Sequence, residues 1–159
     1  MNKLLLFIIL FPSFIQAEEL TLLCEGKRKI RSYMDKSINF DEQEIALLKM
    51  KRDSMEYIGK NSGRKYTFRN EKYIAPKRAP HEDIKINAYY KLTSETISAS
   101  QTITDLGRSD DSTISAISIH VDRSTGKLKE VDNIRNKKTL KINSTNNFIA
   151  FCKKEDGAL

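Results

Sequence analysis

The stretch from residue 117 to residue 129 decides the fold class. It reads Ile117-Ser118-Ile119-His120-Val121-Asp122-Arg123-Ser124-Thr125-Gly126-Lys127-Leu128-Lys129. Up to Val121, every second residue is apolar and β-branched, which is the pattern of a strand with one buried face. A polar turn interrupts the alternation, which resumes at Lys127. Gly126 lies where a hairpin turn needs a positive φ. The stretch therefore predicts two antiparallel strands joined by a turn.

The same alternation extends on both sides of this hairpin. Residues 84–88 precede it with apolar residues at every second position, residues 97–103 do so except at Gln101, and residues 139–142 and 148–151 look like closing strands. Strands that recur every 8–12 residues or so indicate an antiparallel sandwich or a small barrel. We therefore expect an all-β protein, built as a single antiparallel β-sandwich or as a small lipocalin-like barrel.

One segment, Asp41 to Tyr57, is ambiguous. It is rich in Glu, Gln, Leu, Lys and Met, which favour a helix. A helix would place Arg52 in the middle of its apolar stripe, however. We therefore predict two strands, at residues 44–51 and 55–59, with a turn between them.

The N-terminus has the features of a secretory signal peptide. Lys3 supplies a positive charge, an apolar run from Leu4 is interrupted by Pro12, and Ala17 precedes two glutamates. The apolar run is too short for a membrane span, which takes roughly 20 residues. We expect cleavage after Ala17, so that residues 1–17 are a signal peptide and residues 18–159 form a single β-rich domain. The protein would then be periplasmic or secreted, and not an integral membrane protein.

The two cysteines, Cys24 and Cys152, are near the two ends of the mature chain, and both lie in apolar runs. In an oxidising compartment an even number of cysteines indicates a disulfide. A catalytic cysteine would need a base nearby, and no histidine is close to either one in sequence. We predict a disulfide that ties the first strand to the last.

These residues also carry a resemblance. Cys24 followed by Gly26, the hairpin with Arg123 and Thr125-Gly126, and a closing Phe148-x-Ala150-x-Cys152-x-Lys154 occur together in this chain. In this combination the chain resembles small exported, largely uncharacterised bacterial all-β proteins. Such proteins more often have glycine where this chain has Ala150. The resemblance covers about a quarter of the chain and implies no activity.

Positive charge is concentrated in one part of the sequence. The mature chain has 27 basic and 21 acidic residues, and residues 60–78 contain seven of the basic residues but only one acid, Glu71. The candidate anion-binding surface consists of Arg64, Lys65, Arg69, Lys72, Lys77 and Arg78. Basic residues interleaved with aromatic ones are typical of nucleic-acid binding. An exported protein would instead meet anionic lipid, glycan or an acidic protein face.

The alternative interpretation of this segment is structural. In a solvent-facing hairpin the cations would occupy the outer face while Tyr66, Phe68 and Tyr73 supply the inner one. Lysines also discourage pairing between sheet edges.

The sequence contains no convincing catalytic or metal-binding motif. Ser118, His120 and Asp122 would share one strand face, but neighbours two residues apart lie ~6–7 Å from one another, and no nucleophile elbow accompanies them. The run His81-Glu82-Asp83 has no second histidine or cysteine at zinc spacing. We expect no metal, no cofactor and no enzymatic activity.

Taken together, these features predict an exported, non-enzymatic binding protein of the bacterial cell envelope. Its partner would be an envelope protein, as for an inhibitor or immunity-type protein, or an anionic lipid or glycan; no nucleic-acid partner is expected. The alternative is a small lipocalin-like carrier, which would need a cavity in its interior for an apolar ligand.

Overall fold

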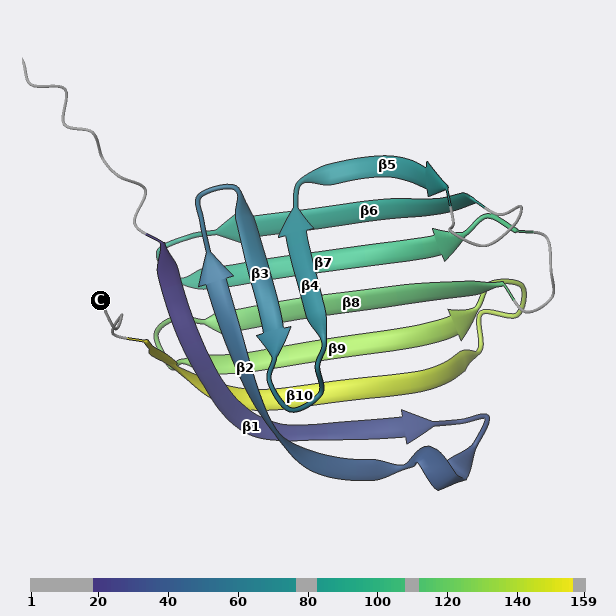
Figure 1. The fold of residues 1–159 in the computed structure, drawn as a ribbon, viewed down its shortest axis with the longest axis horizontal. Helices are drawn as coiled ribbons and strands as arrows, with labels where there is room; N and C mark the ends of the chain where they lie inside the picture. Colours follow the sequence, from purple (N-terminus) through teal and green to yellow (C-terminus); the bar gives the residue numbers. More distant parts are fainter. Residues whose placement is uncertain (1–18, 77–82, 108–111, 156–159) are drawn as a thin grey trace, which may run out of the picture.

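A computed structural model describes residues 19–76, 83–107 and 112–155. Their strands form one antiparallel sheet of ten strands in the order β4-β3-β2-β1-β10-β9-β8-β7-β6-β5, which curls into a nearly closed, barrel-like shape (Figure 1). The all-β prediction is therefore confirmed. The strands are β1 (Leu20–Ser32), β2 (Phe40–Met50), β3 (Ser54–Gly59), β4 (Lys65–Arg69), β5 (Glu71–Pro76), β6 (Asp83–Leu92), β7 (Thr96–Asp105), β8 (Thr113–Asp122), β9 (Lys127–Asn136) and β10 (Ile142–Lys154).

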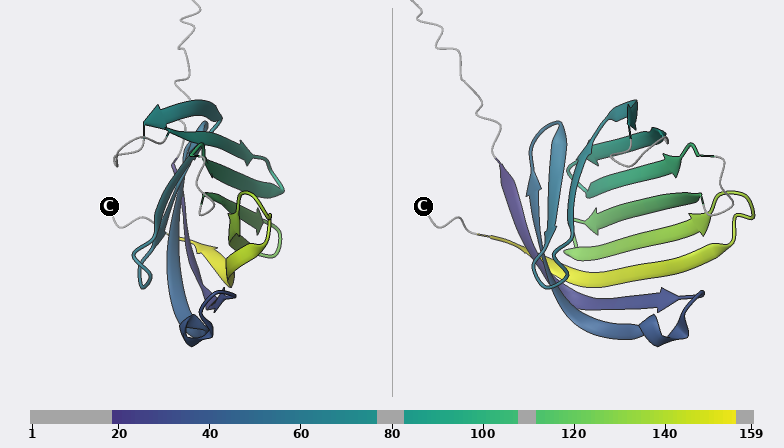
Figure 2. Two further views of the ribbon diagram at one scale, coloured as in Figure 1. Left: turned by 90° about the vertical axis from the view of Figure 1, so that its right-hand side faces the viewer. Right: turned by 45° about the vertical axis from the view of Figure 1, so that its right-hand side comes forward.

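The sheet bends along its two long strands β1 and β2. Figure 2 shows that both strands curve, so that the second half of β2 and the hairpin of β3 and β4 cross over one half of the layer formed by β6 to β10. A short 3-10 helix, η1 (Lys36–Ile38), lies in the turn between β1 and β2. The other half of the inner face of β6 to β10 is not crossed by these strands.

The hairpin that decided the fold class is present as β8 and β9. Val121 pairs with Leu128 across the turn, and Gly126 has a φ of 70°. Ile117, Ile119 and Val121 are buried, whereas Ser118 and His120 are exposed. The alternation therefore assigned the two faces of this strand correctly.

The ambiguous segment forms strands β2 and β3, as predicted, although β2 begins earlier, at Phe40. The expectation of two closing strands is wrong. Residues 139–141 belong to a turn, and one strand, β10, runs from Ile142 to Lys154. Its polar stretch lacked a strand signal in the sequence, but its backbone pairs with β1 on one side and β9 on the other.

The predicted disulfide joins the two terminal strands. Cys24 on β1 lies opposite Cys152 on β10, and the two form a disulfide across a sequence separation of 128 residues. Two positions further along β1, Gly26 lies opposite Ala150. A Cβ at Gly26 would lie 2.0 Å from the Ile149 carbonyl oxygen and 2.7 Å from the Ala150 Cβ, so only glycine fits there.

The corner between β4 and β5 brings the two ends of the sheet together. The side chain of Asn70 acts like a strand segment toward β6: its Oδ1 accepts from the Tyr90 N–H at 2.8 Å, and its Nδ2 donates to the Tyr90 carbonyl at 3.0 Å. The Tyr90 hydroxyl donates to the Lys51 carbonyl. Burial raises the pKa of Tyr90 to about 12, so this hydroxyl keeps its proton at neutral pH.

The core lies between the layers, where β2 to β4 cross the main sheet. It is filled by large apolar side chains with little or no exposure. From the crossing strands these are Leu48, Met50, Met55 and Phe68, and from the main layer Ile97, Ile119, Leu128 and Phe148.

Candidate functional site

An apolar groove lies on the outer face of the two strands that carry the disulfide. Its volume is about 360 Å³, and we call it the lysine groove; its residues are Glu25, Gly26, Lys27 and Lys29 of β1 and Asn147, Ile149 and Phe151 of β10. The two apolar side chains are unusually open to solvent, since Ile149 is 51% and Phe151 66% exposed. Exposed apolar side chains that gather at a groove mark an interaction site.

The alternation of the strands explains why these residues face outward. On β1, Cys24 and Arg28 are buried, and on β10, Phe148 and Ala150 are buried. Because side chains of a strand alternate between the two faces, the residues between these positions point to solvent. The apolar run of β10 therefore supplies both the core and the outer groove.

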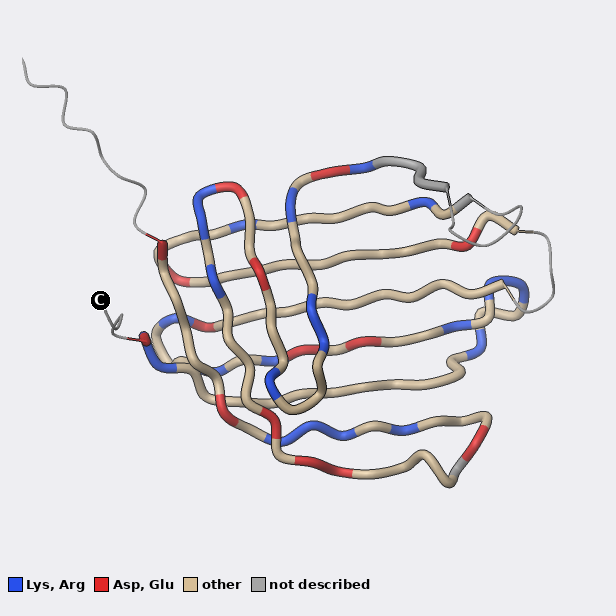
Figure 3. The backbone as a smooth tube through the Cα atoms, in the orientation of Figure 1, with Lys and Arg blue, Asp and Glu red and all other residues tan. Residues whose placement is uncertain are grey.

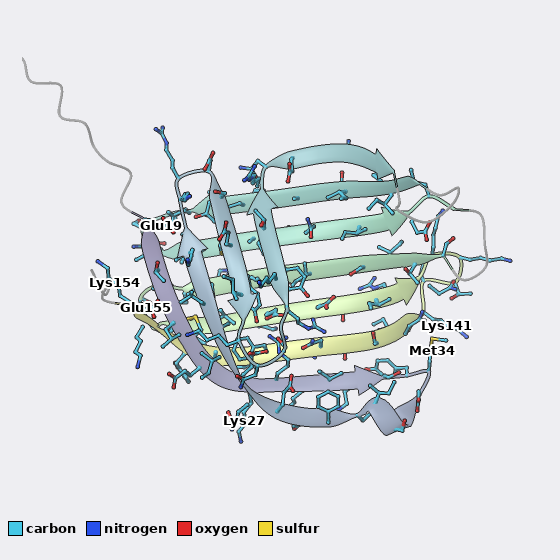
Figure 4. The ribbon with its side chains drawn as sticks, viewed as in Figure 1. Glu19, Lys27, Met34, Lys141, Lys154 and Glu155 are labelled. Atoms are coloured by element: carbon cyan, nitrogen blue, oxygen red, sulfur yellow. A yellow bond between two sulfur atoms is a disulfide. The ribbon has the colours of Figure 1, made fainter. Side chains whose placement is uncertain are left out.

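Lysines flank the two exposed apolar side chains. Ile149 lies between Lys27 of β1 and Lys129 of β9, which are its partners in the two neighbouring strands. Phe151 lies between Glu25 and Lys127 in the same way. Figure 4 shows Lys27 pointing away from the body of the molecule. With Lys29, the surface around the groove carries four lysines, and its acids are Glu25 and Asp41, which lies opposite Lys29 on β2 and is paired with Arg31.

On the inner face of the same strands, Arg28 is the centre of a buried polar network, and both Arg28 and Glu130 have no exposed side-chain surface. The guanidinium donates to both carboxylate oxygens of Glu130, at 2.9 and 3.0 Å, and to Glu44 at 3.2 Å. It also donates to Asn146 Oδ1 and to the Tyr57 hydroxyl, and it lies 4.8 Å from the centre of the Phe148 ring. The network ties β1 to β2, β3, β9 and β10 and so fixes the strands whose outer faces form the groove.

The network keeps its charges. Burial works to lower the pKa of Arg28, but its hydrogen bonds and attraction to Glu130, with further contributions from Tyr57 and Glu44, hold that pKa above its usual value. Burial works to raise the pKa of Glu44, yet hydrogen bonds from Ser62 and Asn61 and the charge of Arg28 leave it below the usual value. Both groups are therefore ionised at neutral pH.

Arg64, the first residue of the candidate anion-binding surface, points inward. Its Nη1 forms an ion pair with Asp132 of β9 at 2.7 Å and a hydrogen bond with the Tyr66 hydroxyl at 3.1 Å. The arginine side chain is 28% exposed and that of Asp132 12%. This ion pair links the turn between β3 and β4 to the main layer, so the charge of Arg64 is already engaged within the fold.

The other residues of the basic strip are divided between separate strands. Lys65 and Arg69 are exposed on β4, and Tyr66 and Phe68 face the interior, as the structural alternative expected. Lys72 is exposed on β5, the strand that follows β4 after the corner at Asn70. Figure 3 shows in blue how the Lys and Arg positions are spread over the sheet. Lys77 and Arg78 lie outside the described residues. Of the described members, Lys65 and Arg69 thus share the exposed face of β4, whereas Arg64 is turned inward and Lys72 lies on β5.

The Ser118, His120 and Asp122 face is placed on the outside of the sheet. His120 Nδ1 is 3.2 Å from the Ser98 hydroxyl. Asp122 accepts hydrogen bonds from the turn residues Ser124 and Thr125, and these hydrogen bonds lower its pKa. Its carboxylate therefore stabilises the hairpin turn.

No group of three or more His, Cys, Asp or Glu that could hold a metal occurs among the described residues. Of the His81-Glu82-Asp83 run, His81 and Glu82 lie outside the described part of the chain.

Sequence reasoning missed the lysine groove. Its residues come from β1 and β10, at opposite ends of the chain, and no stretch of sequence unites them. One signal was present in the sequence. The run from Phe148 to Phe151 is apolar at successive positions, but a strand can bury only every second side chain against a single core. Assigning alternate residues of that run to opposite faces of the strand would have identified Ile149 and Phe151 as exposed apolar residues.

Comparisons with other proteins do not place the chain in a family. No protein-family model, no curated protein and no solved structure matches it. As for membrane spans, the described ranges contain no helix with the length and hydropathy needed to cross a bilayer.

Proposed function

We propose that the protein is an exported, non-enzymatic binding protein of the bacterial cell envelope, and that the lysine groove docks it on an anionic membrane surface. Export rests on the signal-peptide features of residues 1–17, and the Cys24–Cys152 disulfide is compatible with an oxidising compartment. Membrane binding rests on the outer face of β1, β10 and β9.

The observation that carries the proposal is the pair of exposed apolar side chains, Ile149 and Phe151, set among four lysines. A lysine near an anionic bilayer contributes about 1 kcal/mol. An aromatic side chain that enters the headgroup region adds the burial of its apolar area, at ~25 cal/mol per Å². Lysine stems can lie along the apolar surface while their ammonium groups reach lipid phosphates.

A membrane surface matches this face better than a polyanion alone does. A purely electrostatic site would need cations only, whereas here the apolar residues occupy the middle of the lysine cluster. Among the described residues that line the groove, Glu25 is the only acid, and the neighbouring Asp41 on β2 is neutralised by its ion pair with Arg31. The occupant to which we commit is therefore the phosphate-bearing surface of an anionic bilayer.

The carrier alternative gains no support from the half of the interior that β2 to β4 cross. The space between the layers contains the Arg28 network and fully buried large side chains such as Tyr57, Phe68 and Phe148. An apolar ligand in that space would displace buried ion pairs, which is costly. We therefore place lipid contact on the outside of the sheet.

Vesicle co-sedimentation tests the proposal, using residues 18–159 with the disulfide intact. We expect binding to phosphatidylcholine vesicles that contain phosphatidylglycerol, little binding to phosphatidylcholine alone, and a loss of binding as salt screens the charges. Replacing both Lys27 and Lys129 with alanine removes about 2 kcal/mol, so we expect affinity to fall roughly 30-fold. Phe151→Ser should weaken binding at every salt concentration.

Matched controls lie on β6, where Tyr89 is an exposed aromatic residue and Lys91 an exposed lysine. Tyr89→Ser and Lys91→Ala should bind vesicles like the unmodified protein. Equal binding to neutral and anionic vesicles, or full binding by the Lys27 and Lys129 double variant, would refute the proposal. If Lys65→Ala with Arg69→Ala abolishes binding instead, the exposed face of β4 is the membrane-binding surface.

A further inference from the structure

The crossing strands leave part of the inner face of the sheet open to solvent. Figure 1 shows that β4 is the last strand to cross and that β7 to β10 continue beyond it. On β9, Ile134 is 38% exposed, and on β2, Phe40 is 45% exposed. Each lies four positions from a buried residue of its own strand, Glu130 and Glu44, so both point to the inner face. We call the part on β7 to β10 the open inner face; its residues are Ile103, Ser115, Asp132, Ile134, Ser144 and Asn146.

The open inner face is continuous, because its residues are direct neighbours across adjacent strands. In the row nearest the core, Asp132 of β9 lies opposite Asn146 of β10. In the next row, the neighbours from β10 to β7 are Ser144, Ile134, Ser115 and Ile103. This second row continues to Ile86 of β6. From Ile134 to Ile86 it spans about 14 Å, which fits an extended alkyl chain.

The open inner face carries no free charge. Its described residues include no lysine or arginine. Asp132 is its one charged residue, and the ion pair with Arg64 at 2.7 Å balances that charge. A charged ligand would find no counter-charge here, and burying an unpaired charge is costly. The open inner face therefore favours an uncharged ligand, in contrast to the lysine groove on the outer face.

Two buried polar atoms at the inner end of this face have no hydrogen-bond partner within the described part of the chain. They are Asn146 Nδ2 and Asp132 Oδ1, and Asn146 is only 4% exposed. Asn146 Oδ1 accepts from Arg28 at 2.8 Å, and since a guanidinium can only donate, the amide nitrogen must lie on the side away from Arg28. Arg64 binds Asp132 Oδ2 in the same way and leaves Oδ1 unpaired. Buried polar atoms are nearly always paired, so these two point to a ligand.

The chemistry of the two atoms selects the group that binds them. Asn146 Nδ2 is a donor and Asp132 Oδ1 an acceptor, and a hydroxyl accepts from the one while it donates to the other. Directly opposite residues have Cβ atoms about 4.5–5.5 Å apart, so a single oxygen reaches both. A water molecule would satisfy the two atoms but would leave Ile134 exposed. An alcohol with an apolar body satisfies the polar atoms and covers the isoleucine as well.

We infer that the open inner face binds one molecule of an uncharged, apolar alcohol. Its hydroxyl lies between Asn146 and Asp132, and its apolar part lies along the second row, on Ile134 and Ile103. This site is independent of the membrane contact proposed above. It uses the inner face of β7 to β10, whereas the lysine groove is on the outer face of β1 and β10.

NMR titration of isotope-labelled residues 18–159 with the disulfide intact tests the inference, and 1-decanol is the probe. The side-chain amide of Asn146 and the backbone amide of Ile134 should shift and saturate, whereas the amide of Tyr89 on β6 should not. The methyl ether of 1-decanol can accept from Asn146 but cannot donate to Asp132, so its affinity should be roughly tenfold or more lower. Decanoate, which is charged, should also bind more weakly than the alcohol.

Variants separate this site from the lysine groove. Ile134→Ser and, separately, Ile103→Ser should each lower the affinity for 1-decanol roughly fivefold or more, because apolar contact area is lost. Ile134 is exposed, so its change should leave folding intact. The matched control is Ile149→Ser, which alters an exposed isoleucine on the outer face of β10 and should leave 1-decanol binding unchanged. Both inner-face variants should bind anionic vesicles normally.

Four results would overturn the inference. The first is the absence of a saturable shift with 1-decanol, and the second is a set of shifts centred on Ile149 and Phe151 in the lysine groove. The third is equal affinity for the alcohol and its methyl ether. The fourth is normal 1-decanol binding by both Ile134→Ser and Ile103→Ser.

Discussion

Replacing Arg28 with methionine should destabilise the protein more than any exposed substitution. The arginine donates five hydrogen bonds, and two of them go to Glu130, whose side chain has no exposed surface. Methionine has no charge and replaces the aliphatic part of the arginine. The change therefore keeps the apolar packing of that part but removes the positive charge that balances Glu130.

The size of the effect follows from which groups lose their partners. Glu44 keeps hydrogen bonds from the backbone N–H groups of Ile45, Asn61 and Ser62. Glu130 loses both hydrogen bonds of its ion pair. Summing five charged hydrogen bonds at ~1.5–3 kcal/mol each overestimates the effect, because removing Arg28 also removes its own desolvation cost. Breaking one buried pair costs about 3–5 kcal/mol, which is the loss that we expect.

Urea unfolding of Arg28→Met at several pH values measures this loss. At neutral pH the free energy of unfolding should fall by about 3–5 kcal/mol. The lowered pKa of Glu44 gives the unmodified protein stability that is present above the usual glutamate pKa and declines as the pH falls through the lowered value. Part of that lowering comes from the charge of Arg28, which the variant lacks, so the variant loses less of this stability as the pH falls. The difference between the two proteins should therefore shrink toward about pH 4.

A double variant, Arg28→Met with Glu130→Met, is the control. It removes the orphaned carboxylate along with its partner, and replacing a whole buried ion pair by apolar side chains is often close to neutral. We expect it to recover most of the lost stability. The reasoning is refuted if Arg28→Met costs less than about 1 kcal/mol at neutral pH, or if the double variant is less stable than the single one.

Three further predictions concern the closure of the sheet. Changing both Cys24 and Cys152 to serine should lower the free energy of unfolding by about 4–5 kcal/mol, as chain entropy predicts for a loop of 128 residues; thermal unfolding would measure it. Gly26→Ala should destabilise the β1–β10 pair, because its Cβ would lie 2.0 Å from a backbone oxygen of β10, and denaturant unfolding would show it. Asn70→Ala should cost about 1–3 kcal/mol by leaving the buried Tyr90 backbone unpaired, and the Tyr90 amide should lose protection in hydrogen exchange.

Each of these has an outcome that contradicts it. Unchanged stability of the cysteine variant would mean that the disulfide does not restrict the unfolded chain more than the folded one. An unaltered unfolding midpoint for Gly26→Ala would show that β1 and β10 can separate without loss. Full protection of the Tyr90 amide in Asn70→Ala would mean that the corner between β4 and β5 is held by other contacts.

The sequence predicted those elements whose signal is local. The 117–129 hairpin combined alternation with a glycine at the turn, and both were confirmed. Residues 44–51 and 55–59 were assigned to strands because Arg52 would interrupt a helical stripe, and the structure agrees. The disulfide followed from two cysteines in terminal apolar runs. The two strand predictions used only neighbouring residues in the sequence, and the disulfide prediction used only the number and position of the cysteines.

The prediction failed where side-chain pattern and backbone pairing disagreed. Residues 143–147 are polar and showed no alternation, yet they lie within β10 because β1 and β9 supply hydrogen bonds on both sides. Arg28 stands between Lys27 and Lys29, and nothing in the sequence singled it out. It is buried because the alternation of side chains along β1 places it on the inner face, where it meets acids of β2 and β9.

The sequence by itself determined the fold class, the pairing of the cysteines and the alternating faces of the strands. The strand faces follow from the alternation of neighbouring residues, and the disulfide follows from the presence of two cysteines. Only the tertiary structure decided which charges meet. It split the basic strip between β4 and β5, engaged Arg64 with Asp132, and placed lysines of β1 and β9 on either side of Ile149. The physical reason is that strand order and register set these distances, and both depend on contacts between residues far apart in the chain, such as Arg64 with Asp132 and Lys27 with Ile149.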